Sequence, residues 1–487
     1  MSISGVVKNL KKMGVAETLR LRSERKRELD ESRGYLTAAK AKRLAAAKAV
    51  KESLEAVGAD AANIERAEKV ISEIEGCGVD NSTAKLLEKW NRELRRAENT
   101  ECRDWLRRTY LKERIPAAYD ERRELPVENK IVFLQARHGV SQACRYIYDK
   151  IESEYPYEPV LCELYRGIVS SAELYLNAMD FAREAATAKA IMAHSSSPFL
   201  GYIDIRPETK VVQLWHGCGV IKHLGLTAAG KPGVRSKEHY EEFPEYNKYD
   251  AVTICSEEQR WVFEDFMGLE KGDPVLKAWG MTLTDEFFDP GYVENCRRKL
   301  REIIPASEGK KVILYAPTYR GRSPHREAPR LPDVAKFAEK LADDYILIIK
   351  QHQTVSELPE IPEEYRGSFA YDMTRSETMN INELMTVADI MISDYSSVIF
   401  EYSLFERPII FYMYDLEDYR DTRGMYYSYE ELAECGPIFK DDDSMVDYIA
   451  HIDERFDKSK VEAFREKYMS ACDGHATERV MKFVTEA

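Results

Sequence analysis

The sequence predicts an α/β protein in which two doubly wound parallel-sheet domains follow an all-helical N-terminal region. Three observations lead to this fold class. Residues 28–114 are rich in Ala, Glu, Lys, Arg and Leu, which is typical of long helices. Beyond Glu128, short apolar strands alternate with helical stretches, the pattern of a parallel sheet. These strands form two successive sets of similar size, so we expect two domains facing each other, with ligands at the carboxyl ends of the strands.

The composition is that of a globular chain with two or three domains. It has 487 residues, of which 44% are hydrophobic and 32% charged. We find neither an apolar run of about 18 residues, the length that crosses a bilayer, nor a secretory signal. Nine cysteines without a Cys-x-x-Cys pair predict a reduced, cytoplasmic protein without a zinc site. The net charge of −14 argues against nucleic-acid binding.

The first 27 residues combine eight basic side chains with two acidic ones. Apolar residues recur among them at helical spacing: Ile3, Val6, Val7, Leu10 and Met13. Such a helix could lie on an anionic membrane surface. It could equally be an ordinary solvated helix whose apolar stripe packs on the next helix.

The region from 28 to 114 contains no recognisable chemistry. Breaks at Gly58, at Gly76–Gly78 and at Asn81-Ser82 divide it into about three helices, most simply a hairpin or a small bundle. It can serve as a spacer, a docking surface or a homo-oligomerisation element. With Pro116–Pro126 as a linker, the predicted domains are 1–125, 126–290 and 291–487.

The two sets of strands follow in order. The first set comprises Ile131–Leu134, Val160–Leu164, Ala190–Ala193, Val211–Trp215, Ala251–Ile254 and Val275–Trp279. The second comprises Val312–Tyr315, Tyr345–Ile349, Ser368–Tyr371, Ile390–Ile392 and Ile409–Phe411.

Polar groups follow several of these strands. His216 comes directly after a strand and before Gly217, where it can act as a general base near neutral pH, or as a hydrogen-bonded structural residue. Arg320 follows the first strand of the second set, and its guanidinium can grip a phosphate. His352 follows the next strand. Ser396 and Ser397 lie between a strand and a helix, where they either bind an anion or only cap the helix.

Four segments in this order resemble the CDP-glycerol glycerophosphotransferase family, the primases and polymerases of teichoic acids and related polymers. They are 211–222 (Val-Val-Gln-Leu-Trp-His-Gly to Lys222), 313–320 (Ile-Leu-Tyr-Ala-Pro-Thr-Tyr-Arg), 349–352 (Ile-Lys-Gln-His) and 392–412 (Ile-Ser-Asp-Tyr-Ser-Ser to Phe-Tyr). Weaker matches lie at Tyr419, at 423–426 and at Gly436-Pro437. The likeness begins near Lys130.

The resemblance implies two Rossmann-like domains of the GT-B type: an acceptor domain, a domain that binds the CDP-activated donor, and a last helix crossing back. It implies that a polyol phosphate moves from CDP-glycerol or another CDP-polyol to a hydroxyl of a lipid-linked or glycan acceptor, and that CMP leaves. Neither cofactor nor metal is expected. The enzyme would work peripherally on the cytoplasmic face of the membrane.

The resemblance also implies roles for single residues. His216 would activate the acceptor hydroxyl, while His352 would neutralise the charge of the diphosphate. The donor-binding set would be Arg320, Thr318, Ser396, Ser397, Asp394 and Glu401. Lys222 and Gly217 would contact the acceptor or a phosphate.

Two positions depart from the family pattern. Thr282 and Leu283 replace the Pro and Arg of the usual Gly-x-Pro-Arg-Thr-Asp, and Gln353 replaces the usual Pro after His352. These departures leave the donor and acceptor open. Two other hypotheses stay open here: a sugar transferase or epimerase of the same build that uses a UDP-sugar, and a helical docking module carried on an α/β scaffold.

Overall fold

The computed structural model describes residues 15–80, 82–195, 197–232, 234–322, 325–352, 355, 357–376, 378–419 and 424–486, with side chains from residue 31 onward except at 322, 325 and 418. The predicted membrane-binding segment 1–27 therefore lies outside the described residues or, from 15 to 27, outside the described side chains. Gln353 and Arg423 also lie outside them.

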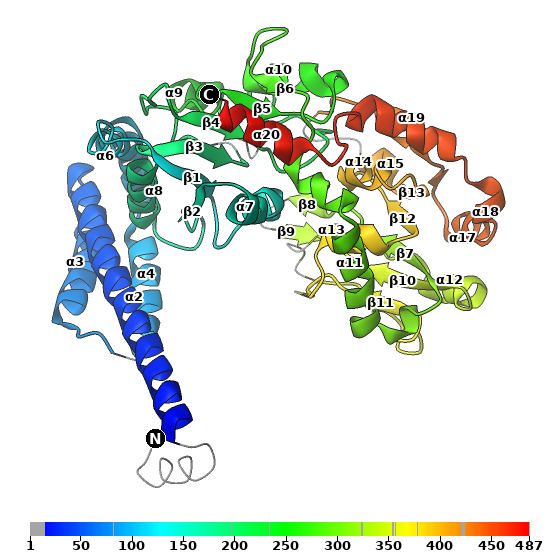
Figure 1. Cartoon of the computed structure of the whole chain (residues 1–487), viewed down its shortest axis with the longest axis horizontal. Helices are drawn as coiled ribbons and strands as arrows, with labels where there is room; N and C mark the ends of the chain where they lie inside the picture. The colour runs from blue at the N-terminus through cyan, green and yellow to red at the C-terminus, as the bar shows by residue number, and fades with distance from the viewer. Residues whose placement is uncertain are drawn as a thin grey trace.

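The N-terminal region is helical, as predicted. It contains α2 (Val15–Ala56), α3 (Ala61–Gly76), α4 (Thr83–Ala97), α5 (Thr100–Thr109), a π-helical turn (Tyr110–Arg114) and α6 (Ile115–Asp120). The N-terminal end of α2 projects away from the rest of the molecule (Figure 1). The prediction of a linker over Pro116–Pro126 is wrong in its first part, because α6 continues the helical path there. Pro116 is compatible with this helix since it lies in the first turn, where no backbone N–H is needed.

The first sheet is entirely parallel. Its order is β2 (Glu158–Glu163), β1 (Glu128–Gln135), β3 (Ala188–Ala193), β4 (Lys210–Gln213), β5 (Ala251–Thr253) and β6 (Leu276–Lys277). Val132 and Leu134 share one apolar cluster with α8 (Ser171–Ala185) and the N-terminal helices. Ile131 and Phe133 face the other way, toward α7 (Gln142–Glu154) and α20 (Ala476–Thr485). The C-terminal helix therefore packs on the first sheet (Figure 1).

The second sheet is parallel too. Its order is β11 (Ala370–Asp372), β10 (Tyr345–Ile349), β7 (Lys311–Tyr315), β12 (Ile390–Ser393), β13 (Ile409–Tyr412) and β14 (Ile438–Phe439). A short antiparallel pair, β8 (Arg320–Arg322) and β9 (His325–Glu327), follows β7. α12 (Val334–Leu341) and α17 (Asp442–Ala450) cover one face, and α11 (Pro290–Ile303) and α13 (Ile381–Val387) the other. The predicted fold class is confirmed.

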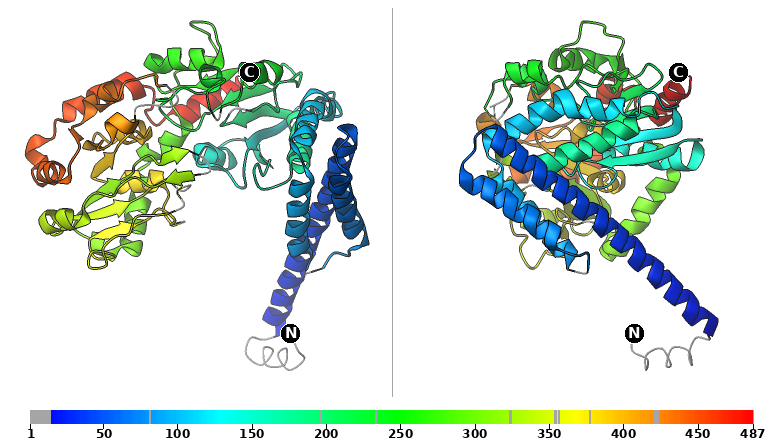
Figure 2. Two further views of the ribbon diagram at one scale, coloured as in Figure 1. Left: turned by 180° about the vertical axis from the view of Figure 1, so that it is seen from behind. Right: turned by 90° about the vertical axis from the view of Figure 1, so that its left-hand side faces the viewer.

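The two domains share one apolar cluster. It includes α10 (Arg260–Met267) of the first domain and α14 (Val398–Ser403) and α19 (Lys458–Met469) of the second. The other helices are α9 (Lys237–Glu242), α15 (Leu416–Tyr419), α16 (Tyr429–Leu432) and α18 (Ile452–Arg455). The left view of Figure 2 shows the two domains side by side, with the N-terminal helices against the first. None of the helices in the described ranges is long and apolar enough to cross a membrane.

Candidate active site

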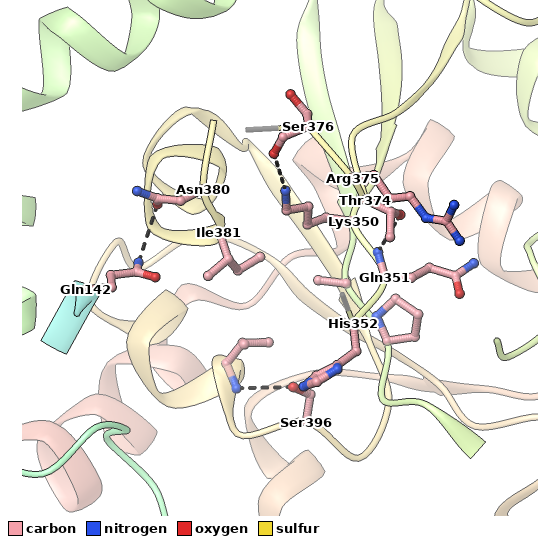
Figure 3. A pocket seen from close by; sticks show the side chains of 13 residues that line it. Gln142, Lys350, Gln351, His352, Thr374, Arg375, Ser376, Asn380, Ile381 and Ser396 are labelled. Atoms are coloured by element: carbon pink, nitrogen blue, oxygen red, sulfur yellow. Dashed lines mark hydrogen bonds between the residues drawn. The ribbon is translucent and has the colours of Figure 1, made fainter. Parts of the chain in front are cut away.

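A cavity of about 550 Å³ opens at the carboxyl ends of β7, β10 and β12. Strand order reverses between β7 and β12, and such switch points are where open parallel sheets bind ligands. The volume is within the range of small-molecule sites. The lining residues are Gln142, Ala316, Pro317, Lys350, Gln351, His352, Thr374, Arg375, Ser376, Asn380, Ile381, Ser396 and Val398 (Figure 3).

The cavity lies between the domains. Gln142 comes from α7 of the first domain, and its amide group donates a hydrogen bond of 3.4 Å to Asn380 of the second (Figure 3). Two predicted site residues, His352 and Ser396, line the same space. The His352 ring packs edge-on against Tyr319, with 5.1 Å between ring centroids. Burial, and then the charge of Arg326, lower the pKa of His352.

The serines after β12 do little as helix caps. The side chain of Ser397 makes no capping hydrogen bond to α14. The Oγ of Ser396 accepts only a long bond of 3.5 Å from the backbone N–H of Val398. A bond of this length is weak, so the capping alternative explains these residues poorly. Their hydroxyls remain available to a ligand.

Several polar residues of the cavity wall are not among the predicted site residues, and they include Lys350, Gln351 and Thr374. Lys350 donates to the carbonyl oxygens of Met373 (2.7 Å) and Met379 (3.2 Å), which fixes its ammonium group there. The side-chain oxygen of Gln351 is buried and has no hydrogen-bond partner among the described residues. Thr374 accepts from the backbone N–H of Gln351 at 3.0 Å. Lys350 and Gln351 directly precede His352, and this was the available signal.

His216 lies on the loop after β4 with its ring exposed. Its Nδ1 is 2.9 Å from the carbonyl oxygen of His194. Since a carbonyl only accepts, Nδ1 carries the proton in the neutral ring and Nε2 can act as the base. Although His216 keeps contact with solvent, the surrounding protein removes part of the ring's hydration, which lowers the pKa of His216 despite this hydrogen bond and favours the neutral imidazole near pH 7.

An unusual backbone conformation orients this histidine. Trp215 has φ = 59°, in the left-handed region that bulky residues rarely adopt. Its ring packs beside His216, with 4.8 Å between centroids, and against Phe263 and Phe266. β4 ends at Gln213 rather than at the predicted Trp215 because this turn breaks the strand.

The His216 loop lies directly on α14. The backbone N–H of Cys218 donates to Glu401 at 3.0 Å. A Cβ on Gly219 would be 2.1 Å from the Phe400 ring, so only glycine allows this close approach. At Gly217, by contrast, no atom lies within 4 Å of a Cβ position, which leaves that face open. His216 is not part of the cavity wall, but its loop contacts the helix that begins just after Ser396 and Ser397.

Arg320, expected to bind the donor, has several partners within the protein. Its guanidinium donates to Asp394 (2.9 Å), to both carboxylate oxygens of Asp415 (2.6 and 3.0 Å) and to the Thr318 carbonyl (2.5 Å). The ring of Tyr419 lies 4.9 Å from the same group. Four of its five N–H donors are therefore committed. Arg320 therefore holds these loops together and keeps one N–H donor without a protein partner in these four bonds.

Of four further predicted contact residues, three have structural partners. Asp394 is buried and accepts hydrogen bonds from the backbone N–H groups of Thr318 and Tyr395 (2.7 and 2.6 Å). Its carboxylate therefore does not face the CDP-activated donor substrate. Thr318 has a buried hydroxyl without a partner among the described residues. Glu401 is buried beneath the His216 loop rather than facing the donor, and burial raises its pKa to about 7. Lys222 donates to the Tyr419 hydroxyl at 2.7 Å.

The described part of the chain contains no group of three or more His, Cys, Asp or Glu side chains placed to hold a metal ion.

Comparison with known proteins gives concordant matches. Residues 117–486 match the family described as CDP-glycerol:poly(glycerophosphate) glycerophosphotransferase. The teichoic acid poly(ribitol-phosphate) polymerase of Bacillus spizizenii is 34% identical over 376 residues, covering 75% of this chain and 57% of that protein. The teichoic acid ribitol-phosphate primase of the same organism is 30% identical over 367 residues, covering 74% of this chain and 92% of the primase. This chain thus spans little more than half the length of the first relative.

One solved structure shows the same fold. The wall teichoic acid polymerase TagF aligns with a TM-score of 0.63 and 22% identity, covering 78% of this chain and 94% of that chain. The resemblance extends to the two-domain arrangement and says nothing more.

Proposed function

The chain belongs to the CDP-glycerol:poly(glycerophosphate) glycerophosphotransferase family, and from this premise we propose that it transfers a polyol phosphate from a CDP-activated polyol to an acceptor hydroxyl, releasing CMP. The acceptor would be a lipid-linked or glycan chain in the synthesis of a teichoic-acid-like or capsular polymer. One observation carries the proposal: the interdomain cavity at the switch point, lined by His352 and Ser396, adjoins the helix on which the His216 loop rests.

In the proposed reaction, Nε2 of His216 takes the proton of the acceptor hydroxyl. The hydroxyl oxygen then attacks the phosphorus that carries the polyol. The bond from that phosphorus to the bridging oxygen breaks, and CMP leaves with the electron pair. Since His194 holds the Nδ1 side of the ring at 2.9 Å, the basic nitrogen is fixed in direction.

The cavity would hold the diphosphate. His352 and the hydroxyl of Ser396 line it from two strand ends, and Lys350 adds a fixed cation. Burial lowers the pKa of His352, and a bound diphosphate would raise it and favour the charged imidazolium. Catalysis would then depend on positioning and charge stabilisation, as phosphoryl transfer requires.

The test is CMP release from CDP-glycerol and CDP-ribitol with acceptor present, with UDP-sugars as a comparison. We expect His216→Ala to reduce the rate by about 10²–10⁴-fold, the usual contribution of a general base. His451→Ala, an exposed histidine after α17, is the matched control and should keep full activity. An unchanged rate in His216→Ala would refute the assigned base, and turnover of UDP-sugars alone would refute the donor class.

We further propose that residues 1–27 bring the enzyme to an anionic membrane surface, where lipid-linked acceptors lie. Their basic composition supports this. The helical region is also our candidate for a homo-oligomer contact. A chain beginning near Lys130 tests both roles, since full turnover with unchanged membrane binding and oligomeric state would exclude them.

A further inference from the structure

A second cavity, of about 180 Å³, lies where the helical region meets the first domain. Its charged lining consists of Arg103 and Arg107 of α5, Arg166 after β2, and Arg235 and His239 near α9. It shares no lining residue with the cavity of the candidate active site. In Figure 1, α8 and α9 lie at the end of the first domain away from α13 and α14. Arg103 and Arg107 also precede the part of the chain that matches the family.

The acidic neighbours of these arginines do not balance them. Asp104 pairs with Arg107 at 2.9 Å, and Glu245 pairs with Arg235. Glu98 lies 3.8 Å from Arg103. No carboxylate among the described residues is within salt-bridge distance of Arg166, so the cluster has an excess of positive charge.

The carboxylate of Glu98 is engaged mainly by the backbone of α8 rather than by Arg103. Its two oxygens accept the backbone N–H groups of Ser171 and Ala172, at 3.0 and 3.2 Å, where α8 begins. Burial raises the pKa of Glu98. An anion entering the cavity would thus meet guanidinium groups that are only partly neutralised.

The floor of the cavity is apolar and aromatic. The rings of Tyr175 and Phe199 lie 6.2 Å apart, and Phe243 lies 5.0 Å from the His239 ring. Arg107 is 5.8 Å from the centre of the Phe243 ring. A ligand for this space therefore combines an oxyanion with a small carbon skeleton.

His239 adds a polar group that is not satisfied. Its Nε2 is buried and has no hydrogen-bond partner among the described residues. Burial, followed by the charges of Arg235 and Arg107, lowers the pKa of this ring to about 4, so the imidazole is neutral near pH 7. Buried polar atoms normally have partners, and a bound oxyanion or its hydroxyl would supply one.

We propose that this cavity is a second, non-catalytic site that binds a small organic phosphate, with the phosphate on the arginines and the carbon part on the aromatic floor. Several guanidinium groups that line one small cavity suit a tetrahedral oxyanion, which has more acceptor oxygens than a carboxylate. The volume admits a polyol phosphate or a lipid phosphate headgroup and is too small for a nucleotide. The inference does not depend on the proposed transferase activity.

The test is calorimetric titration of the full chain with glycerol 3-phosphate at constant ionic strength. We expect Arg107→Gln and Arg166→Gln each to weaken binding about tenfold or more, the effect of losing one charge-assisted hydrogen bond. Arg92→Gln, an exposed arginine on α4, removes the same charge elsewhere and should bind like the parent. His352→Ala should also bind like the parent, because that side chain belongs to the other cavity.

The same experiments define the results that would contradict the second site. Absence of saturable binding in both the titration and the vesicle assay, or a loss of affinity in His352→Ala but not in the two arginine variants, would overturn the proposal. Arg166 is exposed, so its variant should fold, and an unchanged melting temperature checks this. Co-sedimentation with phosphatidic acid vesicles identifies the source: dependence on Arg166 there indicates a lipid headgroup, and dependence only in the titration indicates a free phosphate. If neither measurement depends on Arg166 or Arg107, the site does not exist.

Discussion

Glu401 is the point at which the second domain fixes the loop of the proposed base. It is 7% exposed, accepts the Cys218 N–H at 3.0 Å through one oxygen, and has no partner among the described residues for the other. Burial raises its pKa to about 7, against an ordinary value of 4.5. We predict that Glu401→Gln changes the pH dependence of stability while keeping the contact to Cys218.

The sign and size follow from this shift. The folded state binds the proton of Glu401 more tightly than the unfolded state, so this group lowers the free energy of unfolding as pH rises from about 4.5 to about 7. A difference of two to three pKa units corresponds to about 3 kcal/mol. Gln is neutral and can still accept from Cys218, but its amide NH₂ lacks a partner, which costs about 1 kcal/mol. The variant should be slightly less stable than the parent near pH 5 and more stable near pH 8.

The assay is urea unfolding, followed by tryptophan fluorescence, at several pH values between about 5 and 8. At each pH the variant is compared with the parent, so that the contributions of the other buried carboxyl groups cancel. Glu339→Gln, at an exposed position on α12, is the matched control and should leave the pH dependence unchanged. A stability difference between parent and Glu401→Gln that stays constant across this range would refute the reasoning. Glu401→Ala, which loses the acceptor, should in addition slow CMP release.

Three other predictions concern single contacts. Gly219→Ala should lower the melting temperature and slow CMP release, because the added methyl meets Phe400 at 2.1 Å; parent-like values would show that α14 can move aside. Arg320→Gln should cost about 3 kcal/mol of unfolding free energy, since it leaves Asp394 and Asp415 without their cation; a cost under about 1 kcal/mol in urea unfolding would mean that the pairs contribute little. Residues 1–27 should bind anionic vesicles with an affinity that falls as salt rises; equal co-sedimentation with neutral vesicles would remove that role.

Much of the fold could be predicted because its strands are continuous apolar runs. β10 and β12 coincide with their predicted ranges to within one residue. The pair β8–β9 and the two-residue β14 were not predicted, because they are too short to show a period. α6 was missed since Pro116 reads as a break unless one knows that it occupies the first turn of a helix.

The candidate site likewise contains residues whose placement the sequence predicts and residues whose placement it does not. His352 and Ser396 follow neighbouring strands, so their placement in one cavity follows from parallel topology. Arg320 also follows a strand, but its partner Asp415 lies 95 residues further along the chain, beyond any local pattern. The assigned roles of His216 and His352 stay predictions until the activity is measured.

The amino-acid sequence alone determined that this chain builds two parallel α/β sheets behind helices, and at which strand ends its reactive side chains lie. Local backbone preference and apolar periodicity are properties of neighbouring residues, so they can be read without the fold. Only the tertiary structure decided which of those side chains remain available to a ligand. Whether Arg320 meets a phosphate or two carboxylates, and whether Glu401 faces solvent or the Cys218 N–H, depends on segments that pack together from distant parts of the chain.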